Sequence, residues 1–378
     1  MKLGRCIAAL ICCFGTIAGA RKAAGDYIVY IGSYTNTTAK GIYAARFDSA
    51  TGALGALDLV AEDVYPAQVW ASPNGRFLYA ANWQGTDAAP GDTITAYAID
   101  RKTGGLTLLN KVKCGGSGPN QVVVDPSGKI AVAVNYRSGS VAAFGIEPDG
   151  RLSEAFYIDQ HAGQPTPPSR QPGPRAHGVV FSSDSKFAYV ADIGLDRVYS
   201  YRLDAAHRTM TPLDPPYVTQ TAGSGPRRLQ LHPNGRFLYL ARETDSSVTA
   251  FAVDNGHLKE IQNISTLPEG QTRNTTAEIL IDKTGRFVYV SNRGHDTIAV
   301  FAVDAGSGML TAVDHTPAGG GIPRNFSIDP SGNYLLTSNQ TGENIVVFRI
   351  DRQTGRLTPT GQELKLANPG SIFFIKAS

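Results

Sequence analysis

Cysteine is scarce in this sequence. Only four of the 378 residues are cysteines, and Cys6, Cys12 and Cys13 all lie close to the N-terminus. Neither Cys12 nor Cys13 stands where a lipoprotein signal would place its lipidated cysteine. Without the first 20 residues Cys114 is the only cysteine left, which excludes an internal disulfide and a thiolate metal site. The stability of the fold therefore has to come from packing.

Strong charge of one sign is also lacking. The net charge is +3, charged residues make up 18% of the chain, and both signs are dispersed along it. This pattern argues against nucleic acid as a partner. The sequence also has no His-x-x-x-His pair, no EF-hand loop and no glycine-rich phosphate loop before a helix. We therefore predict neither a bound metal nor another cofactor, although a cation held by backbone carbonyls stays open.

Long apolar runs are absent outside the N-terminus. Lys2 and Arg5 precede an apolar stretch over 7–18, and small residues over 18–20 complete the pattern of a secretory signal peptide. The stretch is too short to span a bilayer comfortably, and a buried N-terminal helix is the alternative. We predict a signal peptide over 1–20, cleavage after Ala20, and a periplasmic or secreted protein with no membrane attachment. Residues 21–378 would then form one domain.

What the sequence does contain is a repeat. A strand-like apolar segment, an acidic turn and an apolar restart recur about 50 residues apart, which indicates one supersecondary unit used seven times. Glycine (41) and proline (22) suit many short strands joined by tight turns. The seven acidic turns begin at Phe47-Asp48, Ile99-Asp100, Ile146-Glu147, Leu203-Asp204, Val253-Asp254, Val303-Asp304 and Ile350-Asp351.

Each repeat contains a second turn that completes four strands. Six copies resemble Asp125-Pro126-Ser127-Gly128, flanked by β-branched, aromatic and aliphatic residues, which is the pattern of a β-hairpin. No 10-residue window keeps a helical period without Gly or Pro. We predict an all-β, seven-bladed β-propeller with four antiparallel strands per blade. The ring would be closed by pairing 27–32 with 371–375, at opposite ends of the chain.

At two positions of the repeat the residue type differs from copy to copy, whereas a purely structural position would keep one residue type. They lie eight residues before the turn glycine (the upstream position) and eight after it (the downstream position), and the hairpin brings both to one mouth of the channel. The upstream position holds Ala67, Asn120, His177, Arg227, Ala277 and Arg324, and the downstream position holds Trp83, Tyr136, Ile193, Glu243, Arg293 and Gln340. Ionisable groups that converge on one concavity predict a binding or active site; ordinary ion pairs on a solvated rim are the alternative.

The residue types at this mouth suggest distinct roles. Arginine recognises phosphate or carboxylate with two hydrogen bonds. Glu243 between arginines would stay ionised and could act as a base, and His177 could relay a proton. The Asn or Asp before the downstream position, such as Asp192, is predicted to cap the turn. His232 is predicted to be structural. His161, His207, His257 and His315 are predicted to lie in exposed loops or turns.

These segments resemble the seven-bladed propeller lactonases, the family of bacterial 6-phosphogluconolactonase and fungal carboxymuconate-lactonizing enzyme. The resemblance covers nearly all of 21–378, with departures from the family pattern at Gln121, Arg175 and Leu280. It rests on segments that include Tyr30-Ile31-Gly32-Ser33-Tyr34-Thr35, Ala176-His177-Gly178, Gly225-Pro226-Arg227, Glu243-Thr244-Asp245, Ser291-Asn292-Arg293-Gly294-His295-Asp296 and Pro323-Arg324-Asn325-Phe326.

The resemblance implies a catalytic set of His177, Arg227, Glu243 and Arg293. We expect hydrolysis of a sugar-derived lactone, with Glu243 or His177 taking a proton from water and Arg227 stabilising the oxyanion. Arg293 and Arg324 would hold a phosphate or carboxylate, and Asn120 is a further substrate-binding candidate. The expected partner is a small lactone or sugar acid. A non-enzymatic binding or scaffold propeller and a lactonizing cycloisomerase are the alternatives, and the oligomeric state stays open.

Overall fold

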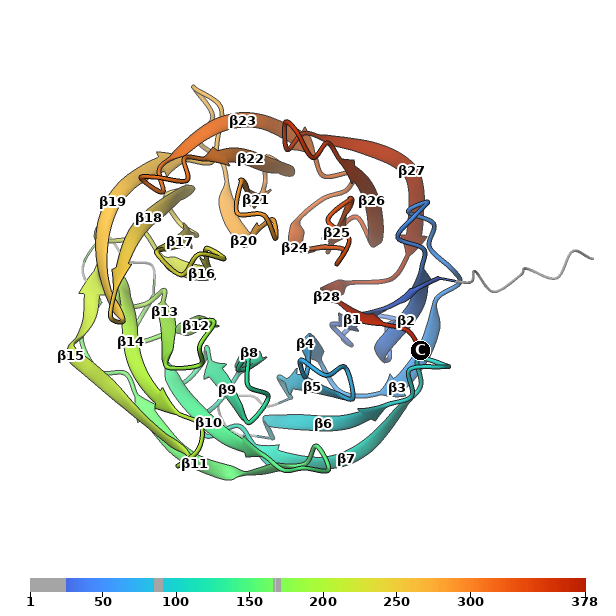
Figure 1. Cartoon of the computed structure of the whole chain (residues 1–378), viewed down its shortest axis with the longest axis horizontal. Helices are drawn as coiled ribbons and strands as arrows, with labels where there is room; N and C mark the ends of the chain where they lie inside the picture. Colours follow the sequence, from blue (N-terminus) through green and yellow to red (C-terminus); the bar gives the residue numbers. More distant parts are fainter. Residues whose placement is uncertain (1–24, 85–90, 166, 168–170) are drawn as a thin grey trace, which may run out of the picture.

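Seven four-stranded antiparallel sheets form a closed ring around a central channel in the computed structural model (Figure 1). The structure describes residues 25–84, 91–165, 167 and 171–378. The predicted signal peptide over 1–20 lies outside these residues. Within them there is no helix, and hence none that could cross a membrane. The seven-bladed propeller predicted from the repeat is confirmed.

Each blade runs outward from the channel in strand order (Figure 1). The innermost strands are β28 (Pro369–Lys376), β4 (Pro66–Ala71), β8 (Pro119–Val124), β12 (Ala176–Phe181), β16 (Pro226–Leu231), β20 (Thr275–Ile281) and β24 (Pro323–Ile328). The second strands are β1 (Tyr27–Ser33), β5 (Phe77–Asn82), β9 (Ile130–Asn135), β13 (Phe187–Asp192), β17 (Phe237–Arg242), β21 (Phe287–Arg293) and β25 (Tyr334–Asn339).

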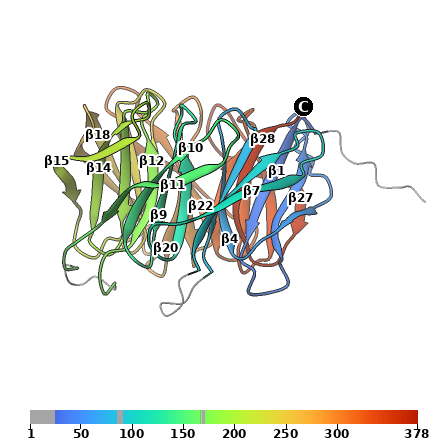
Figure 2. The same cartoon turned by 90° about the horizontal axis from the view of Figure 1, so that it is seen from below.

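The remaining strands form the outer half of each blade, and Figure 2 shows the ring from the side. The third strands are β2 (Gly41–Phe47), β6 (Thr93–Ile99), β10 (Ser140–Ile146), β14 (Arg197–Asp204), β18 (Ser247–Asp254), β22 (Thr297–Val303) and β26 (Asn344–Ile350). The outermost strands are β3 (Asp58–Glu62), β7 (Leu106–Lys113), β11 (Leu152–Gln160), β15 (Thr209–Thr219), β19 (His257–Ser265), β23 (Leu310–Pro317) and β27 (Leu357–Lys365).

The ring closes through strands from the two ends of the chain. β28 pairs antiparallel with β1, with Tyr27 opposite Lys376 and Ile31 opposite Ile372. One blade is therefore built from both termini, as the sequence predicts. Neighbouring innermost strands contact one another all the way round the channel.

The hairpin turns follow from the residue types in the second motif. In the turn that joins β8 to β9, Asp125 Oδ1 accepts hydrogen bonds from the backbone N–H groups of Lys129 (2.9 Å) and Ile130 (2.8 Å). Gly128 has a φ of 74°, a conformation that costs glycine little. Side-chain capping by Asp and a left-handed glycine thus fix where each innermost strand ends.

A tyrosine on the second strand joins most blades to the next one. The hydroxyl of Tyr239 donates a hydrogen bond of 3.0 Å to the carbonyl of Gly308, in the acidic turn of the following blade. Tyr30, Tyr79 and Tyr289 make the same contact with Gly104, Gly150 and Gly355. Tyr189 is equally buried, but its hydroxyl has no partner among the residues that the structure describes.

This difference gives a matched pair of variants. Tyr239→Phe should lower the free energy of unfolding by about 1–2 kcal/mol, because it leaves the Gly308 carbonyl without its hydrogen bond. Tyr189→Phe should change it by less than about 0.5 kcal/mol, because no bond is lost. Urea unfolding followed by tryptophan fluorescence measures both. Equal losses in the two variants would show that the inter-blade hydrogen bond adds nothing beyond ring packing.

All seven innermost strands begin with an irregularity that positions the channel residues. In β16, Pro226 pairs with Arg242 and Arg228 pairs with Ala241, so Arg227 is an extra residue in a β-bulge. Register shifts occur at the matching place in the other six blades. The upstream position of the sequence repeat falls in this bulge.

Candidate active site

Four of the predicted site residues come from the same end of four blades. Asn120, His177, Arg227 and Arg324 are the second residues of β8, β12, β16 and β24, at the bulge. Because a bulge breaks the alternation of side chains along a strand, consecutive residues can face one space. Arg227 and Arg228 line the same small cavity, as do Arg324 and Asn325.

Glu243 joins two arginines in one ion-pair cluster. Its Oε2 accepts hydrogen bonds from Arg227 Nε (2.8 Å) and Arg293 Nη2 (2.9 Å). Glu243 follows β17, and Arg293 is the last residue of β21, so the downstream position supplies both. Arg227 also donates to the carbonyl of Ala277, and Arg293 donates to that of Thr276 (2.9 Å). Each guanidinium is thereby fixed to the backbone of β20 as well as to Glu243.

The charges of this cluster set the protonation state of the carboxylate. Although burial raises it, the guanidinium groups of Arg227 and Arg293 together hold the pKa of Glu243 below its usual range. Glu243 is therefore ionised at neutral pH. Its Oε1 has no hydrogen-bond partner among the described residues, and its side chain is 25% exposed. This oxygen is available to a water molecule or a ligand.

His177 is buried and neutral. Burial, reinforced by the positive charge of Arg227, places the pKa of His177 well below its ordinary value. The amide Nδ2 of Asn120 lies 2.8 Å from the His177 carbonyl oxygen and 3.0 Å from His177 Nδ1. Since a carbonyl oxygen only accepts, Nδ2 is the donor in both contacts, and Nδ1 is an acceptor. The proton of the neutral ring is then on Nε2, which makes His177 a hydrogen-bond donor at its other side.

Arg324 has no salt-bridge partner in the described chain, whereas the charge of Arg228 is offset only by Glu278. Arg324 Nε donates to the hydroxyl of Tyr34 (2.6 Å), and its guanidinium lies 5.3 Å from the centre of that ring. Arg228 is 7% exposed, and its Nε and Nη1 have no hydrogen-bond partner in the described chain. The nearest carboxylate oxygen, Oε2 of Glu278, is 3.6 Å from Arg228 Nε. Both guanidiniums line the small cavity beside Asn120.

Aromatic side chains form another part of the same region. Trp83 and Tyr136 have ring centres 6.0 Å apart, and the ring of Tyr136 meets that of His177 edge-on at 5.7 Å. Arg175 lies over the Tyr136 ring at 5.7 Å. Apolar ring faces next to guanidinium groups suit a ligand with both a carbon ring and an anionic group.

The sequence analysis overlooked Tyr34, Arg228 and Glu278. Arg228 and Glu278 stand one residue past the upstream position, a position that the sequence analysis did not consider, and the bulge brings them to the same region. The two consecutive arginines in Pro226-Arg227-Arg228 were the feature of the sequence that could have identified Arg228 as a site residue. Tyr34 lies between blades, just after β1, and its contact with Arg324 joins residues from opposite ends of the chain.

Two histidine predictions are wrong, and the structural roles predicted for Asp192 and His232 hold. His315 lies within β23 rather than in an exposed loop, and its Nε2 is buried without a hydrogen-bond partner in the described chain. His161 is 3% exposed, not a surface residue. Its Nδ1 lies 2.7 Å from Asp192 Oδ2 and its ring stacks on Tyr199, because both partners come from the following blade. Asp192 caps its turn as predicted, accepting from the backbone N–H groups of Gly194 and Leu195. His232 is structural, with Nε2 3.0 Å from the Gly285 carbonyl.

Metal-ligating groups do not gather in the described part of the chain: no set of three or more His, Cys, Asp or Glu side chains could hold an ion there. Cys114 is buried, and burial raises its pKa to about 12, so its thiol stays protonated.

Several known proteins that are similar to this chain in sequence and fold carry the names of lactonases. The chain is 33% identical over 251 residues to the 6-phosphogluconolactonase of Bacillus subtilis, spanning 66% of this chain and 69% of that protein. It is 31% identical over 304 residues to the 6-phosphogluconolactonase of Formosa agariphila, spanning 79% and 86%. The solved structure of the periplasmic gluconolactonase of Pseudomonas aeruginosa matches with a TM-score of 0.87 and 31% identity, covering 93% of this chain and 99% of that one.

The sequence profile described as "Lactonase, 7-bladed beta-propeller" matches residues 28–374, which is almost the whole described chain. The resemblance noted from short segments therefore extends over every blade of the ring. The Bacillus and Formosa relatives are lactone hydrolases by name, and this protein is an enzyme of that kind. The chain belongs to the lactonase family of seven-bladed β-propellers.

Proposed function

We propose that this protein hydrolyses the lactone of a sugar acid at the mouth of the channel, in the cluster of Glu243, Arg227, Arg293 and His177. The observation that carries the proposal is a partly exposed carboxylate kept ionised by two arginines, with one oxygen that has no hydrogen-bond partner in the described chain. Ester hydrolysis needs a base beside the attacking water and donors beside the carbonyl oxygen. This cluster supplies both within one small region.

The chemistry follows from which atoms remain available. Glu243 Oε1 takes a proton from water as the water oxygen attacks the lactone carbonyl carbon. The carbonyl oxygen becomes an oxyanion that accepts hydrogen bonds from His177 Nε2 and from a guanidinium. When the carbonyl re-forms, the ring carbon–oxygen bond breaks, and the proton held by Glu243 passes to the departing ring oxygen. The product is the open hydroxy acid, and no cofactor takes part.

The different burial of the arginine side chains suggests roles for Arg227 and Arg293 that differ from those expected from the sequence. The Arg227 side chain is 2% exposed, and its Nε and Nη1 are already bonded to Glu243 and Ala277. We therefore assign Arg227 to positioning Glu243. The Arg293 side chain is 14% exposed, against 2% for Arg227, so Arg293 is the better oxyanion donor. We assign His177 Nε2 as a second donor and not as the base, because the acceptor Nδ1 of His177 is occupied by Asn120.

The surplus positive charge favours an anionic lactone. Glu243 offsets only one of the two charges of Arg227 and Arg293, and Arg324 faces the cavity with a tyrosine as its only hydrogen-bond partner in the described structure. Buried cations are stabilised by an anionic ligand. The names of the Bacillus and Formosa relatives point to a phosphorylated lactone, whereas that of the Pseudomonas structure points to a neutral one.

Comparing these two substrates tests the proposal. We expect higher kcat/KM on 6-phosphogluconolactone than on glucono-1,5-lactone. Arg324→Ala should raise KM for the phosphorylated lactone about tenfold, because a charged hydrogen bond is lost, and should leave KM for the neutral lactone within about twofold. Equal effects on both lactones would remove the anion-binding role. Binding of either lactone without release of acid would instead indicate a binding propeller.

The pH dependence of hydrolysis should report Glu243 alone on the acid side. The arginines lower the pKa of Glu243 below that of an ordinary carboxyl, so the active ionised form is present at neutral pH and is lost only as the pH falls through that lowered value. His177 has a pKa well below its usual one and stays neutral, so no limb is expected near its ordinary value of about 6.5. Initial rates between pH 4 and 8, corrected for spontaneous hydrolysis, measure this. An acid limb centred between pH 6 and 7 would assign the base to histidine.

We also propose that the protein acts outside the cytoplasm after cleavage behind Ala20. The basic start, the apolar stretch over 7–18 and the small residues before the cleavage point support this. Sequencing the N-terminus of the protein recovered from its native host would give Arg21 first if the proposal is right, and Met1 if it is wrong.

A further inference from the structure

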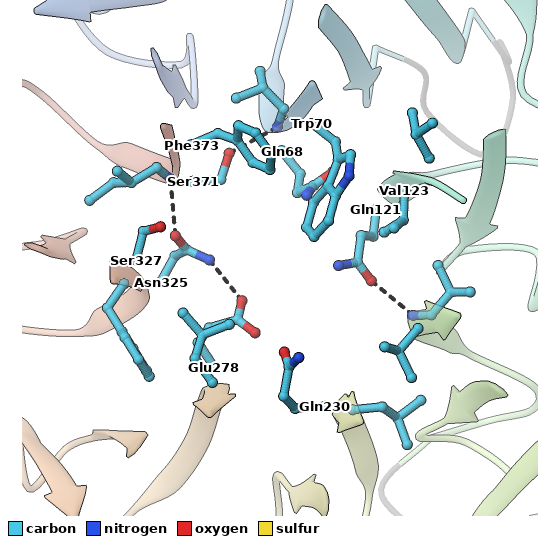
Figure 3. A pocket seen from close by; sticks show the side chains of 18 of the residues that line it. Gln68, Trp70, Gln121, Val123, Gln230, Glu278, Asn325, Ser327, Ser371 and Phe373 are labelled. Carbon is cyan, nitrogen blue, oxygen red and sulfur yellow. Dashed lines mark hydrogen bonds between the residues drawn. The ribbon is translucent and has the colours of Figure 1, made fainter. Parts of the chain in front are cut away.

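A second cavity lies in the channel beyond the residues of the proposed active site. It has a volume of about 240 Å3 and is lined by residues of all seven innermost strands. None of the residues proposed for catalysis lines it, and it adjoins the small cavity beside Asn120 through Gln68, Asn325 and Ser371, which line both. Trp70 and Phe373 lie on one side of this cavity, with Gln230 and Glu278 on the opposite side (Figure 3). We call it the distal cavity.

A belt of inter-blade hydrogen bonds fixes the polar side of the distal cavity. Gln68 Oε1 accepts from the backbone N–H of Val122 (3.0 Å), and Gln121 Oε1 accepts from that of Val179 (2.9 Å). Both glutamines line the cavity, and each keeps an amide NH2 group that makes no hydrogen bond within the described chain. Two donors are thus held in fixed places without being used by the fold.

Acceptors stand across from these donors. Glu278 accepts a hydrogen bond of 2.7 Å from Asn325 Nδ2, and Arg228 lies close to the same oxygen, so its charge is largely compensated. The amide of Gln230 lines the cavity and has no hydrogen-bond partner among the residues described. Neither a lysine nor an arginine lines the cavity. The distal cavity therefore offers hydrogen bonds but no free positive charge for an anion.

An aromatic surface completes the lining. The rings of Trp70 and Phe373 have centres 4.9 Å apart and are inclined at 56°. Both residues also line a wider space of about 620 Å3, whose walls include the hairpin turn at Asn74 and Gly75. That turn lies at the end of the blade opposite to the upstream position. The distal cavity consequently opens through the other face of the ring, away from Glu243.

We propose that the distal cavity is a second small-molecule site that binds a neutral monosaccharide. One aromatic wall suits the C–H face of a sugar ring, and amide and carboxylate groups on the other walls suit its hydroxyls, which both donate and accept. The volume restricts the ligand to about one ring. The lack of a lining cation disfavours phosphorylated or acidic sugars, which separates this site from the proposed active site. The inference does not rest on lactone hydrolysis.

The chain offers a direct reporter for this site. It contains two tryptophans, Trp70 in the distal cavity and Trp83 beside Tyr136 near the other mouth. Trp83→Phe makes Trp70 the sole emitter. Titration of this full-length variant with D-glucose should give a saturable change in Trp70 fluorescence with millimolar half-saturation. D-gluconate and glucose 6-phosphate should bind about tenfold more weakly or not at all, because the cavity has no cation for them.

Two further changes separate binding from folding. Gln230→Leu in the Trp83→Phe background should weaken glucose binding about tenfold by removing a hydrogen-bonding group, and Leu280→Phe should abolish binding by filling the cavity. Both proteins are accepted only if their unliganded Trp70 emission and unfolding midpoint match the parent. No saturable change with glucose would overturn the proposal, as would equal binding of gluconate. Glucose binding by this variant together with a lack of lactone turnover by the unsubstituted protein would overturn the proposed activity and leave this site standing.

Discussion

Glu243→Gln is expected to lower kcat for lactone hydrolysis by about 10²- to 10⁴-fold, the usual contribution of a positioned general base. A glutamine can still accept the hydrogen bonds of Arg227 and Arg293 through its amide oxygen, so the shape of the cluster should survive. It cannot take a proton from water at the position of Oε1. Steady-state rates on 6-phosphogluconolactone, corrected for spontaneous hydrolysis, measure the effect.

Asp245→Asn is the matched control for this variant. Asp245 lies two residues further along the same turn and pairs with Arg242 rather than with the cluster. Asp245→Asn replaces a carboxylate with an amide and removes one negative charge, as Glu243→Gln does. A general electrostatic effect on the rate would therefore appear in both variants. A fall in kcat of similar size in Asp245→Asn, or an active Glu243→Gln enzyme, would contradict the assignment of Glu243 as the base.

Arg293→Ala should lower kcat by about 10²- to 10³-fold, as expected when a donor to the oxyanion is removed. It should also move the acid limb of the pH profile upward. Removing one of the two cations that lower the pKa of Glu243 lets that pKa rise, so the ionised base is lost at a higher pH than in the parent enzyme. The two effects together require that Arg293 contacts both the reacting oxygen and Glu243.

The size of the effect on KM decides between two roles for Arg293. An increase in KM with kcat unchanged would show that Arg293 holds the substrate's anionic group, the role expected from the sequence, and not the oxyanion. Arg286→Ala is the control. Arg286 lies in the exposed turn between β20 and β21 of the same blade, where its guanidinium contacts the Phe287 ring, and its loss should leave both parameters within about twofold.

The fold could be predicted because each of its turns is specified by a few neighbouring residues and because the same unit is repeated along the sequence. A turn built from Asp125 and Gly128 is specified by a few neighbouring residues, and seven copies of the unit leave a ring as the arrangement. The closure of β1 on β28 followed from finding half of a hairpin at each terminus. These inferences needed the strand pattern but no knowledge of which side chains touch.

The site residues could be predicted only where equivalent positions of the sequence repeat occupy equivalent places in the blades. His177, Arg227 and Arg324 were found because each occupies the bulge, and Glu243 and Arg293 because the hairpin returns to the same end. Contacts between blades were not visible. The burial of His161 depends on Asp192 and Tyr199 in the next blade, and the contact of Tyr34 with Arg324 joins the two ends of the chain.

The most direct test of the account is acid release from 6-phosphogluconolactone by residues 21–378, measured beside Glu243→Gln at the same protein concentration. The account predicts turnover far above the spontaneous rate in the parent protein and nearly none above it in the variant, with both proteins folded. Turnover that survives in Glu243→Gln would place the chemistry outside this cluster. A folded parent protein that accelerates neither this lactone nor glucono-1,5-lactone would contradict the proposed function itself.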